Sequence, residues 1–187
     1  MRGLCWGSDC TSACTMPIAR LTPSHAAAYR SLMLEAYALH PDAFTATVAE
    51  RCDLPLSWWA ARVSEAATAR EAVFGAFVDE ELAGVAGLSF EAREKTRHKA
   101  TLFGMYVPAR HRQHGVGRQL VAAVLEHAGR SPGTMLVQLT VTEGNAPAQR
   151  LYASCGFVPF GTEPLAVRVR AGYVSKVHMW CGLGVPA

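Results

Sequence analysis

Residues 100–128 are the part of the sequence that most restricts how this chain can fold. The apolar stretch "ATLFGMYV" (100–107) is typical of a strand, and the basic stretch "PARHRQHGVG" leads from it towards a helix over 117–128. Apolar residues recur along that helix at the helical period and predict one buried face: Leu120, Val121, Val124, Leu125 and Ala128. Gly129 is expected to end the helix in a left-handed conformation. A strand must therefore turn into an amphipathic helix through a segment rich in glycine and positive charge.

This turn suits an anion, most often a phosphate. The first N–H groups of a helix have no partner within the helix, and the helix dipole adds partial positive charge there. Gly115 and Gly117 remove side chains that would block a phosphate, while Arg112 and Arg118 add charge-assisted contacts. On its own, a Gly-Val-Gly turn remains a weak indication of such a site.

Two familiar phosphate-binding loops do not fit the sequence. A Walker loop requires Gly-Lys-Ser/Thr, but Gly117 is followed by Arg118. A Rossmann fingerprint requires a third glycine where this chain has Leu120, and the acidic residue expected some 20 positions later is not evident.

Composition sets broader limits. The chain has 187 residues, half of them hydrophobic, which is the size of one domain with a real core. A net charge of +3 without a Lys/Arg run gives no reason to expect nucleic acid as a partner. No apolar stretch approaches the roughly 20 residues that span a bilayer, so we expect a cytoplasmic protein with no membrane partner and with cysteines present as thiols.

Residues 1–15 are expected to be a disordered leader before a single domain over 16–187. Their cysteines, Cys5, Cys10 and Cys14, raise the alternative of a metal site, but the spacing is not a CxxC pair and no histidine lies nearby. No metal is therefore expected. Met16 is a possible true start, and deletion of 1–15 is expected to leave solubility and activity intact.

The other elements follow from periodicity and turn residues. Expected strands cover 17–21, 72–78, 82–90, 135–141, 157–161 and 172–180. Thr22-Pro23 begins one helix, which stops at His40-Pro41, and a second helix follows Pro55. Trp58 and Trp59 on that second helix are interpreted as core, with a pocket role as the alternative. A last helix begins at Asn145 and ends at Gly156.

Two segments together resemble the GNAT family of N-acetyltransferases. "RQHGVG" (112–117) is similar to the Arg/Gln-x-x-Gly-x-Gly/Ala motif of that family, at the usual distance from the strand-end Val107. "NAPAQRLYASCGF" (145–157) is similar to its second segment, Asn-x-x-Ala-x-x-Leu-Tyr-x-x-x-Gly-Phe. The resemblance covers 17–180 and is specific over 100–157. Pro108, directly after Val107, departs from the usual proline position and indicates a different local turn.

The resemblance implies an α/β (α+β) fold, with a mixed central sheet of about six to seven strands flanked by about four helices. It also implies that the strands 100–107 and 135–141 are parallel neighbours that splay apart. Acetyl-CoA is the implied co-substrate. The implied coenzyme contacts are Met105, Tyr106, Val107, Arg112, Gln113, His114, Gly115, Val116, Gly117, Arg118, Asn145, Ala148 and Tyr152.

The same resemblance implies roles in catalysis. Tyr152 matches the position of the general acid that protonates the leaving thiolate, and the Val107 N–H is placed to polarise the thioester carbonyl. Tyr152 has the alternative role of a buried anchor, Asn145 caps its helix in either case, and Tyr106 faces either the acceptor or the core. His178 is interpreted as structural.

The base and the acceptor stay open. Glu143 is the base candidate carried forward, beside Glu91 and His98, and each of them is also an ordinary surface group. The expected reaction is direct attack of a primary amine, on a small molecule or a protein, in a ternary complex. A longer acyl group, or an acyl-CoA-binding module without turnover, are the alternatives. The protein is expected to be a monomer or a homodimer.

Overall fold

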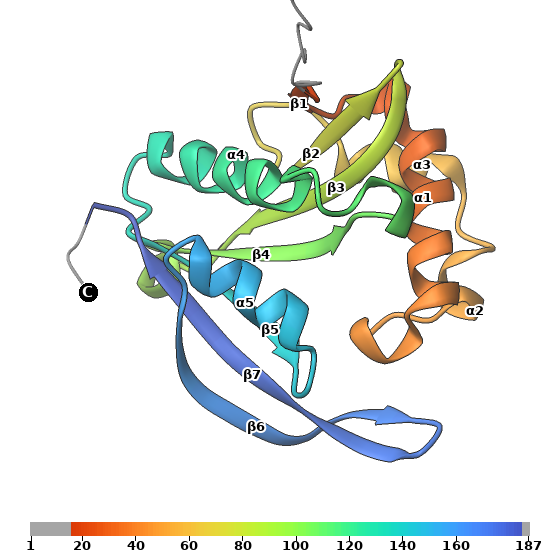
Figure 1. Cartoon of the computed structure of the whole chain (residues 1–187). Coiled ribbons are helices and arrows are strands. Elements are labelled where there is room, and N and C mark those ends of the chain that lie inside the picture. Colours follow the sequence, from red (N-terminus) through yellow and green to blue (C-terminus); the bar gives the residue numbers. More distant parts are fainter. Residues whose placement is uncertain (1–15, 185–187) are drawn as a thin grey trace, which may run out of the picture.

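The computed structural model describes residues 16–184, so the predicted leader over 1–15, its cysteines included, lies outside the described residues. A seven-stranded mixed sheet, ordered β1-β2-β3-β4-β5-β7-β6, runs through the molecule (Figure 1). Its strands are β1 (Ile18–Arg20), β2 (Glu71–Val78), β3 (Glu81–Phe90), β4 (Lys99–Tyr106), β5 (Leu136–Thr142), β6 (Val158–Val169) and β7 (Gly172–Gly182). The mixed sheet that the sequence predicted is confirmed.

Helices cover both faces of this sheet. On one side lie α4 (Val116–Arg130) and α5 (Ala146–Ser154); on the other lie α1 (Ala26–Leu39) and α3 (Leu56–Arg62), with the short α2 (Val48–Arg51) between those two in sequence. Successive side chains of a strand point to opposite faces of the sheet, so one strand contributes residues to the core on each face. Phe74 packs with the α4 cluster, whereas its neighbour Val73 packs with α1 and α3. Trp59 is buried in that second cluster, which confirms its core role.

Local sequence rules explain most element ends. Thr22 forms a capping box with His25, but the first turn, η1 (Pro23–His25), is a 3-10 helix that leads into α1. The β2–β3 hairpin turns through Asp79 and Glu80, both with positive φ, as a two-residue turn between twisted strands requires. We expected a three-residue turn, but Glu81 already belongs to β3.

The predicted end of α4 was wrong. Gly129 does not have positive φ and lies inside the helix, which continues to Arg130 and is capped at Ser131, whose N–H bonds to the Ala128 carbonyl. The left-handed glycine comes later, at Gly133. The sequence Gly129-Arg-Ser-Pro-Gly contains two glycines that could end a helix. Pro132 disfavours a helical conformation of the residue before it, so the helix stops shortly before the second glycine, Gly133.

The two parallel strands separate soon after they meet. β4 and β5 pair only at Lys99↔Leu136, Ala100↔Val137 and Thr101↔Gln138, and the remaining neighbours among the described strands are antiparallel. β4 also carries a bulge against β3, where Val85 pairs with Tyr106 but Gly87 with Phe103. Gly104 adopts φ +57° in this bulge. The bulge bends β4 where it leaves β5, so the predicted splay is confirmed and has a local cause.

Two glycine substitutions that should change the free energy of unfolding in opposite directions test the bulge. We expect Gly104→Ala to lower the free energy of unfolding by about 1–2 kcal/mol, because a left-handed conformation is unfavourable for any residue with a Cβ. Crowding contributes little, since the nearest atom to that Cβ is Met33 Cε at 3.7 Å. Gly129→Ala, in the last turn of α4 with nothing within 4 Å, should instead raise it by up to about 0.5–1 kcal/mol. Urea unfolding of both variants measures this, and equal stability would contradict the bulge assignment.

Candidate active site

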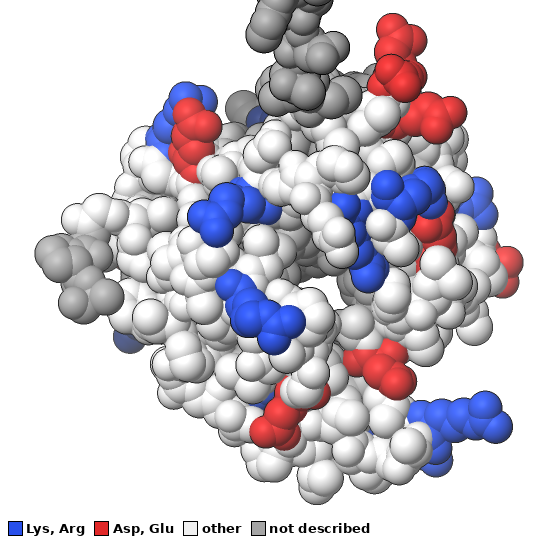
Figure 2. Space-filling model, in the orientation of Figure 1, with Lys and Arg blue, Asp and Glu red and all other residues white. Residues whose placement is uncertain are grey.

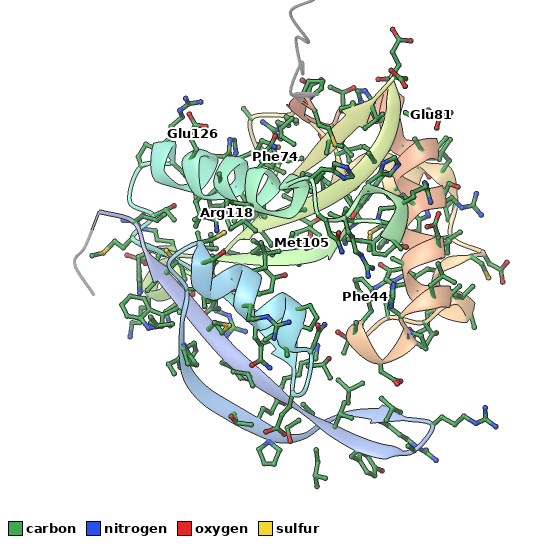
Figure 3. The ribbon with its side chains drawn as sticks, viewed as in Figure 1. Phe44, Phe74, Glu81, Met105, Arg118 and Glu126 are labelled. Carbon is green, nitrogen blue, oxygen red and sulfur yellow. The ribbon has the colours of Figure 1, made fainter. Side chains whose placement is uncertain are left out.

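Two adjoining cavities open where β4 and β5 diverge. The larger, of about 680 Å³, lies between the turn before α4, the start of α5 and the end of α1. The smaller, of about 200 Å³, lies between the separated strands and the segment 43–45. Their common wall consists of Ala43, Phe44, Met105, Asn145, Ala148 and Tyr152. Figure 3 shows Met105 between Phe44 on one side and Arg118 on the other, and Figure 2 shows Lys and Arg side chains around the hollow.

The turn before α4 presents a row of free amides to the larger cavity. The Arg112 N–H bonds to the Ala109 carbonyl, and the Gln119 N–H bonds to the Gly115 carbonyl. Within residues 16–184, the N–H groups of 113–118 between them bond to no other group. The left-handed Gly115, φ +74°, ends the turn and begins the helix. The free amides thus begin at Gln113, one residue after the start of the motif at Arg112.

Arg112 lies on the larger cavity but is already bonded within the protein. Its Nε donates to the Val107 carbonyl at 2.8 Å, and its Nη2 lies 3.1 Å from His40 Nε2. The side chain therefore closes the turn that Pro108 opens and ties it to the end of α1. One guanidinium can still present its other N–H groups to a ligand, because it carries five donors.

The second glycine of the turn has a packing role that the sequence did not reveal. A Cβ at Gly117 would lie 2.9 Å from Leu151 Cδ2 and 3.1 Å from Met105 Cε. Glycine at this position therefore lets α4 approach α5 and β4 closely. Arg118, next along, donates to the Ser154 carbonyl at 3.4 Å and joins the same two helices.

The remaining residues predicted to contact the coenzyme differ in how they face the larger cavity. Val116 points its side chain into the core, so only its backbone faces a ligand. Gln113 is exposed on the cavity wall, whereas His114 is exposed and lines neither cavity. Asn145 Oδ1 accepts from the Ala148 N–H at 3.3 Å, which confirms the helix cap. The Val107 N–H, on the cavity wall, bonds to no other group within residues 16–184.

Tyr152 lies where the two cavities meet. It is 8% exposed, packs against Phe157, and directs its hydroxyl to Met105 Sδ at 3.5 Å. Burial raises the pKa of Tyr152 to about 12, so the hydroxyl keeps its proton at neutral pH. The only acceptor for this proton among the described residues is a thioether, which is weak. The hydroxyl is therefore available to a stronger acceptor that enters the cavity.

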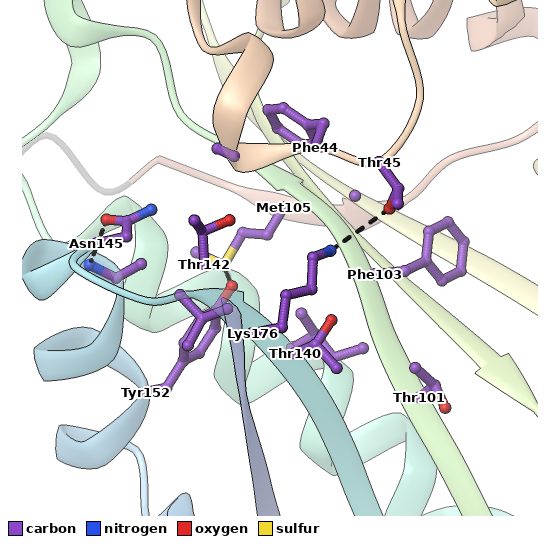
Figure 4. A pocket seen from close by; sticks show the side chains of 15 residues that line it. Phe44, Thr45, Thr101, Phe103, Met105, Thr140, Thr142, Asn145, Tyr152 and Lys176 are labelled. Carbon is purple, nitrogen blue, oxygen red and sulfur yellow. Dashed lines mark hydrogen bonds between the residues drawn. The ribbon is translucent and has the colours of Figure 1, made fainter. Parts of the chain in front are cut away.

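The smaller cavity contains residues that sequence reasoning did not select. Phe44, Thr45, Thr140, Thr142 and Lys176 line it (Figure 4). The Thr142 hydroxyl donates to the Asp42 carbonyl at 2.9 Å, and Lys176 Nζ lies 3.5 Å from Thr45 Oγ1. These contacts hold the segment after α1 over the opened strands. They join residues about 100 or more positions apart, so no local pattern could have indicated them.

Three predicted base candidates lie outside both cavities. Glu143 is exposed, and its backbone N–H bonds to the Ser175 carbonyl. Glu91 and His98 lie at the opposite end of β4, where the His98 carbonyl accepts from Met135. The two cavity walls include none of the three among the described residues. Sequence spacing placed Glu143 after β5 correctly but gave no direction for its side chain.

Tyr106 and His178 each contact a glutamate within the protein. The Tyr106 hydroxyl donates to Glu35 Oε1 at 3.0 Å on the α1 side, and burial together with Glu35 raises the pKa of Tyr106. It lies in the second core cluster, in agreement with the core alternative, and on the wall of the larger cavity, but it does not line the smaller one. His178 pairs with Glu163 at 3.2 Å across β6 and β7, which confirms its structural role.

The family model described as "Acetyltransferase (GNAT) family" matches residues 33–157, which include the turn, α4, β5 and α5. The chain belongs to the GNAT family of acetyltransferases. The seven-stranded sheet with its separated β4 and β5 is the GNAT fold. GNAT acetyltransferases act on amine acceptors. A comparison with curated proteins found no match to this sequence.

Solved structures confirm the GNAT fold. A GNAT-family acetyltransferase from Streptococcus pneumoniae is 23% identical, with TM-score 0.80, over 90% of this chain and 99% of that chain. The yncA protein from Salmonella typhimurium, solved with its cofactor acetyl-CoA, is 21% identical, with TM-score 0.75, over 92% and 96%. A ribosomal-protein-alanine N-acetyltransferase from Brucella melitensis is 22% identical, with TM-score 0.73, over 90% and 100%.

Two further findings concern residues 16–184 alone. No helix in this stretch of the GNAT chain is long and apolar enough to cross a membrane. No three His, Cys, Asp or Glu side chains in it gather as a set that would hold a metal ion.

Proposed function

We propose that this GNAT protein transfers the acetyl group of acetyl-CoA to a primary amine, by direct attack in a ternary complex. The observation that carries the proposal is the position of the free amides of 113–118. All of these residues except His114 line the same cavity as Val107 and Tyr152, at the end where β4 and β5 separate. An anion-binding turn, an opened strand and a proton donor therefore share one continuous surface.

The residues of the larger cavity fit the groups of acetyl-CoA. The amides of 113–118, at the N-terminus of α4, would bind the diphosphate, with Arg118 also on the cavity wall. The unpaired edge of β4 around Met105 and Val107 would bond to the amide groups of the pantetheine arm as a neighbouring strand does. The free N–H of Val107 would then donate to the thioester carbonyl oxygen.

Transfer forms a C–N bond, breaks the C–S bond, and moves one proton from nitrogen to sulfur. The Val107 N–H stabilises the oxygen charge that develops on attack. The Tyr152 hydroxyl donates to the departing sulfur in place of Met105 Sδ. A thiol has a reference pKa of about 8.5, well below the value of about 12 for Tyr152, so this hydroxyl acts chiefly as a hydrogen-bond donor. The proton that converts the thiolate to a thiol comes from the attacking nitrogen, which becomes acidic once the C–N bond has formed.

A cytoplasmic location belongs to this proposal. The cysteines between residues 16 and 184, namely Cys52, Cys155 and Cys181, are free thiols, which suits a reducing compartment.

Two measurements on the purified protein test the proposal. Isothermal titration should give 1:1 binding of acetyl-CoA, and a thiol-release assay over a panel of amines should give turnover that depends on both substrates. Butyryl-CoA and octanoyl-CoA in the same assay show whether a longer acyl group is preferred. Binding without turnover on every amine would contradict the transferase proposal and favour an acyl-CoA-binding module. Absence of coenzyme binding would contradict both.

A further inference from the structure

One charged side chain lies in the smaller cavity, beyond the wall that it shares with the larger one. Among the residues that line this cavity, Lys176 alone carries a charge. The others are hydroxyl groups (Thr45, Thr101, Thr140 and Thr142), the amide of Asn145, the phenol of Tyr152 and apolar groups. Figure 4 shows Lys176 rising from β7 into this space, with its ammonium towards Thr45.

The Lys176 ammonium has no counter-charge in direct contact. Its contact at hydrogen-bond distance is Thr45 Oγ1 at 3.5 Å, and within residues 16–184 no carboxylate lies within 4.0 Å of Nζ. The nearest candidate is Glu163, opposite Lys176 in the β6–β7 register, but its carboxylate is bonded to His178 at 3.2 Å. The strand pair thus directs the acid and the amine to different partners.

Such an ammonium favours the entry of an anion. Lys176 is partly buried, and burial lowers its pKa, with Glu163 acting more weakly in the opposite direction. A charge removed from water is unfavourable unless it is paired and hydrogen-bonded. A carboxylate in the cavity would pair with Lys176 and accept from the neighbouring hydroxyl of Thr45.

The geometry points to an acceptor that carries a carboxylate beside its amine, in other words a small amino acid. This inference rests on the proposed function, because it assigns the smaller cavity to the acceptor. Lys176, which lines the smaller cavity but not the larger one, would hold the carboxylate, so that the neighbouring amine can face the shared wall at Met105 and Tyr152. A volume of about 200 Å³ suits a molecule smaller than the usual ligands of 300–1,000 Å³ pockets. Polycationic acceptors would meet like charge at Lys176.

Matched acceptors test the assignment. Thiol release is measured with acetyl-CoA and with L-methionine, L-phenylalanine and β-alanine, each beside its primary amide and the amine that lacks the carboxyl group; spermidine is the polycation. For the parent protein, kcat/KM should be about 10- to 100-fold higher for the preferred amino acid than for its amide, which is the expected range for a hydrogen bond to a charged group. Most of the difference should lie in KM.

Variants assign the preference to one side chain. Lys176→Met should remove the difference between amino acid and amide, mainly by raising KM for the amino acid; Lys176→Arg should restore some of this difference because the cation is kept. Lys95→Met, at an exposed position in the β3–β4 connection, is the matched control and should behave as the parent. Coenzyme affinity should not change in any of the three.

The outcomes separate the two proposals. If the parent prefers amides, plain amines or spermidine, or if Lys176→Met keeps the preference for the carboxylate, the anion assignment is overturned and the transferase proposal stands. If acetyl-CoA binds but no acceptor of any charge is acetylated, the transferase proposal is overturned, and this inference with it.

Discussion

Tyr152→Phe should lower kcat by about 100-fold and leave the affinity for acetyl-CoA nearly unchanged. The reason is that the hydroxyl donates a hydrogen bond to the departing sulfur as negative charge develops there, and loss of one such donor typically lowers kcat by about 10²–10³-fold. The phenyl ring that remains keeps its packing against Phe157. The hydroxyl loses only a weak bond to Met105 Sδ, so the fold should persist. Single-turnover thiol release, under conditions where chemistry limits the rate, measures the effect.

The pKa of Tyr152 fixes the expected pH dependence. Burial raises this pKa from 10.0 to about 12, so the hydroxyl stays protonated through the alkaline range in which acceptor amines lose their proton. The kcat of the parent should therefore rise with pH and show no falling limb from Tyr152 below about pH 10. A falling limb at lower pH that disappears in Tyr152→Phe would contradict the buried setting of this group.

The control for this variant is Tyr173→Phe. Tyr173 is 61% exposed on the β6–β7 hairpin and lines neither cavity, so its hydroxyl should not affect kcat. The role assigned to Tyr152 is wrong if Tyr152→Phe turns over as fast as the parent and as Tyr173→Phe.

The second large effect concerns Gly117 in the turn before α4. Gly117→Glu should bind acetyl-CoA at least about 10- to 100-fold more weakly than Gly117→Gln, which corresponds to about 1.4–2.8 kcal/mol. Both side chains have the same size and meet the same Leu151 and Met105 atoms, so the comparison isolates charge from packing. A carboxylate at this place repels the diphosphate that the amides of 113–118 are proposed to bind. Isothermal titration gives both affinities.

Two further observations strengthen this comparison. The difference in acetyl-CoA affinity between Gly117→Glu and Gly117→Gln should become smaller at high salt, because ions screen exposed charges. Glutamate in the first turn of a helix is favourable, so loss of α4 cannot explain a weaker affinity of the Glu variant. Equal affinities of the Glu and Gln variants at low salt would show that the diphosphate lies elsewhere.

Sequence reasoning succeeded where the determinants are local. The capped start of α5 at Asn145, the apolar face of α4 and the hairpin before β4 all follow from neighbouring residues, and the structure confirms them. The turn before α4 also appears where the glycine pair predicted it. Gly129 was misread because Gly133 lies only four residues away and both positions suit a helix end.

Sequence reasoning failed where the site depends on contacts between distant segments. Phe44 and Thr45 reach the smaller cavity only because Thr142 bonds to Asp42 and Lys176 approaches Thr45. The second role of Gly117, close packing of α4 against Leu151, needs the position of α5. Arg112 lies on the wall of the larger cavity, but its contact with His40 at the end of α1 joins segments that no local pattern connects.

The three-residue contact between β4 and β5 has a mechanical consequence. It divides the sheet into a half with β1 to β4 and a half with β5 to β7, joined by backbone hydrogen bonds at one end only. The core beneath α4 includes residues of both halves, such as Leu102 and Leu139, so side-chain packing spans the gap that the backbone leaves open. Because the strands are already unpaired beyond that end, a substrate can enter between β4 and β5 without breaking backbone hydrogen bonds between them.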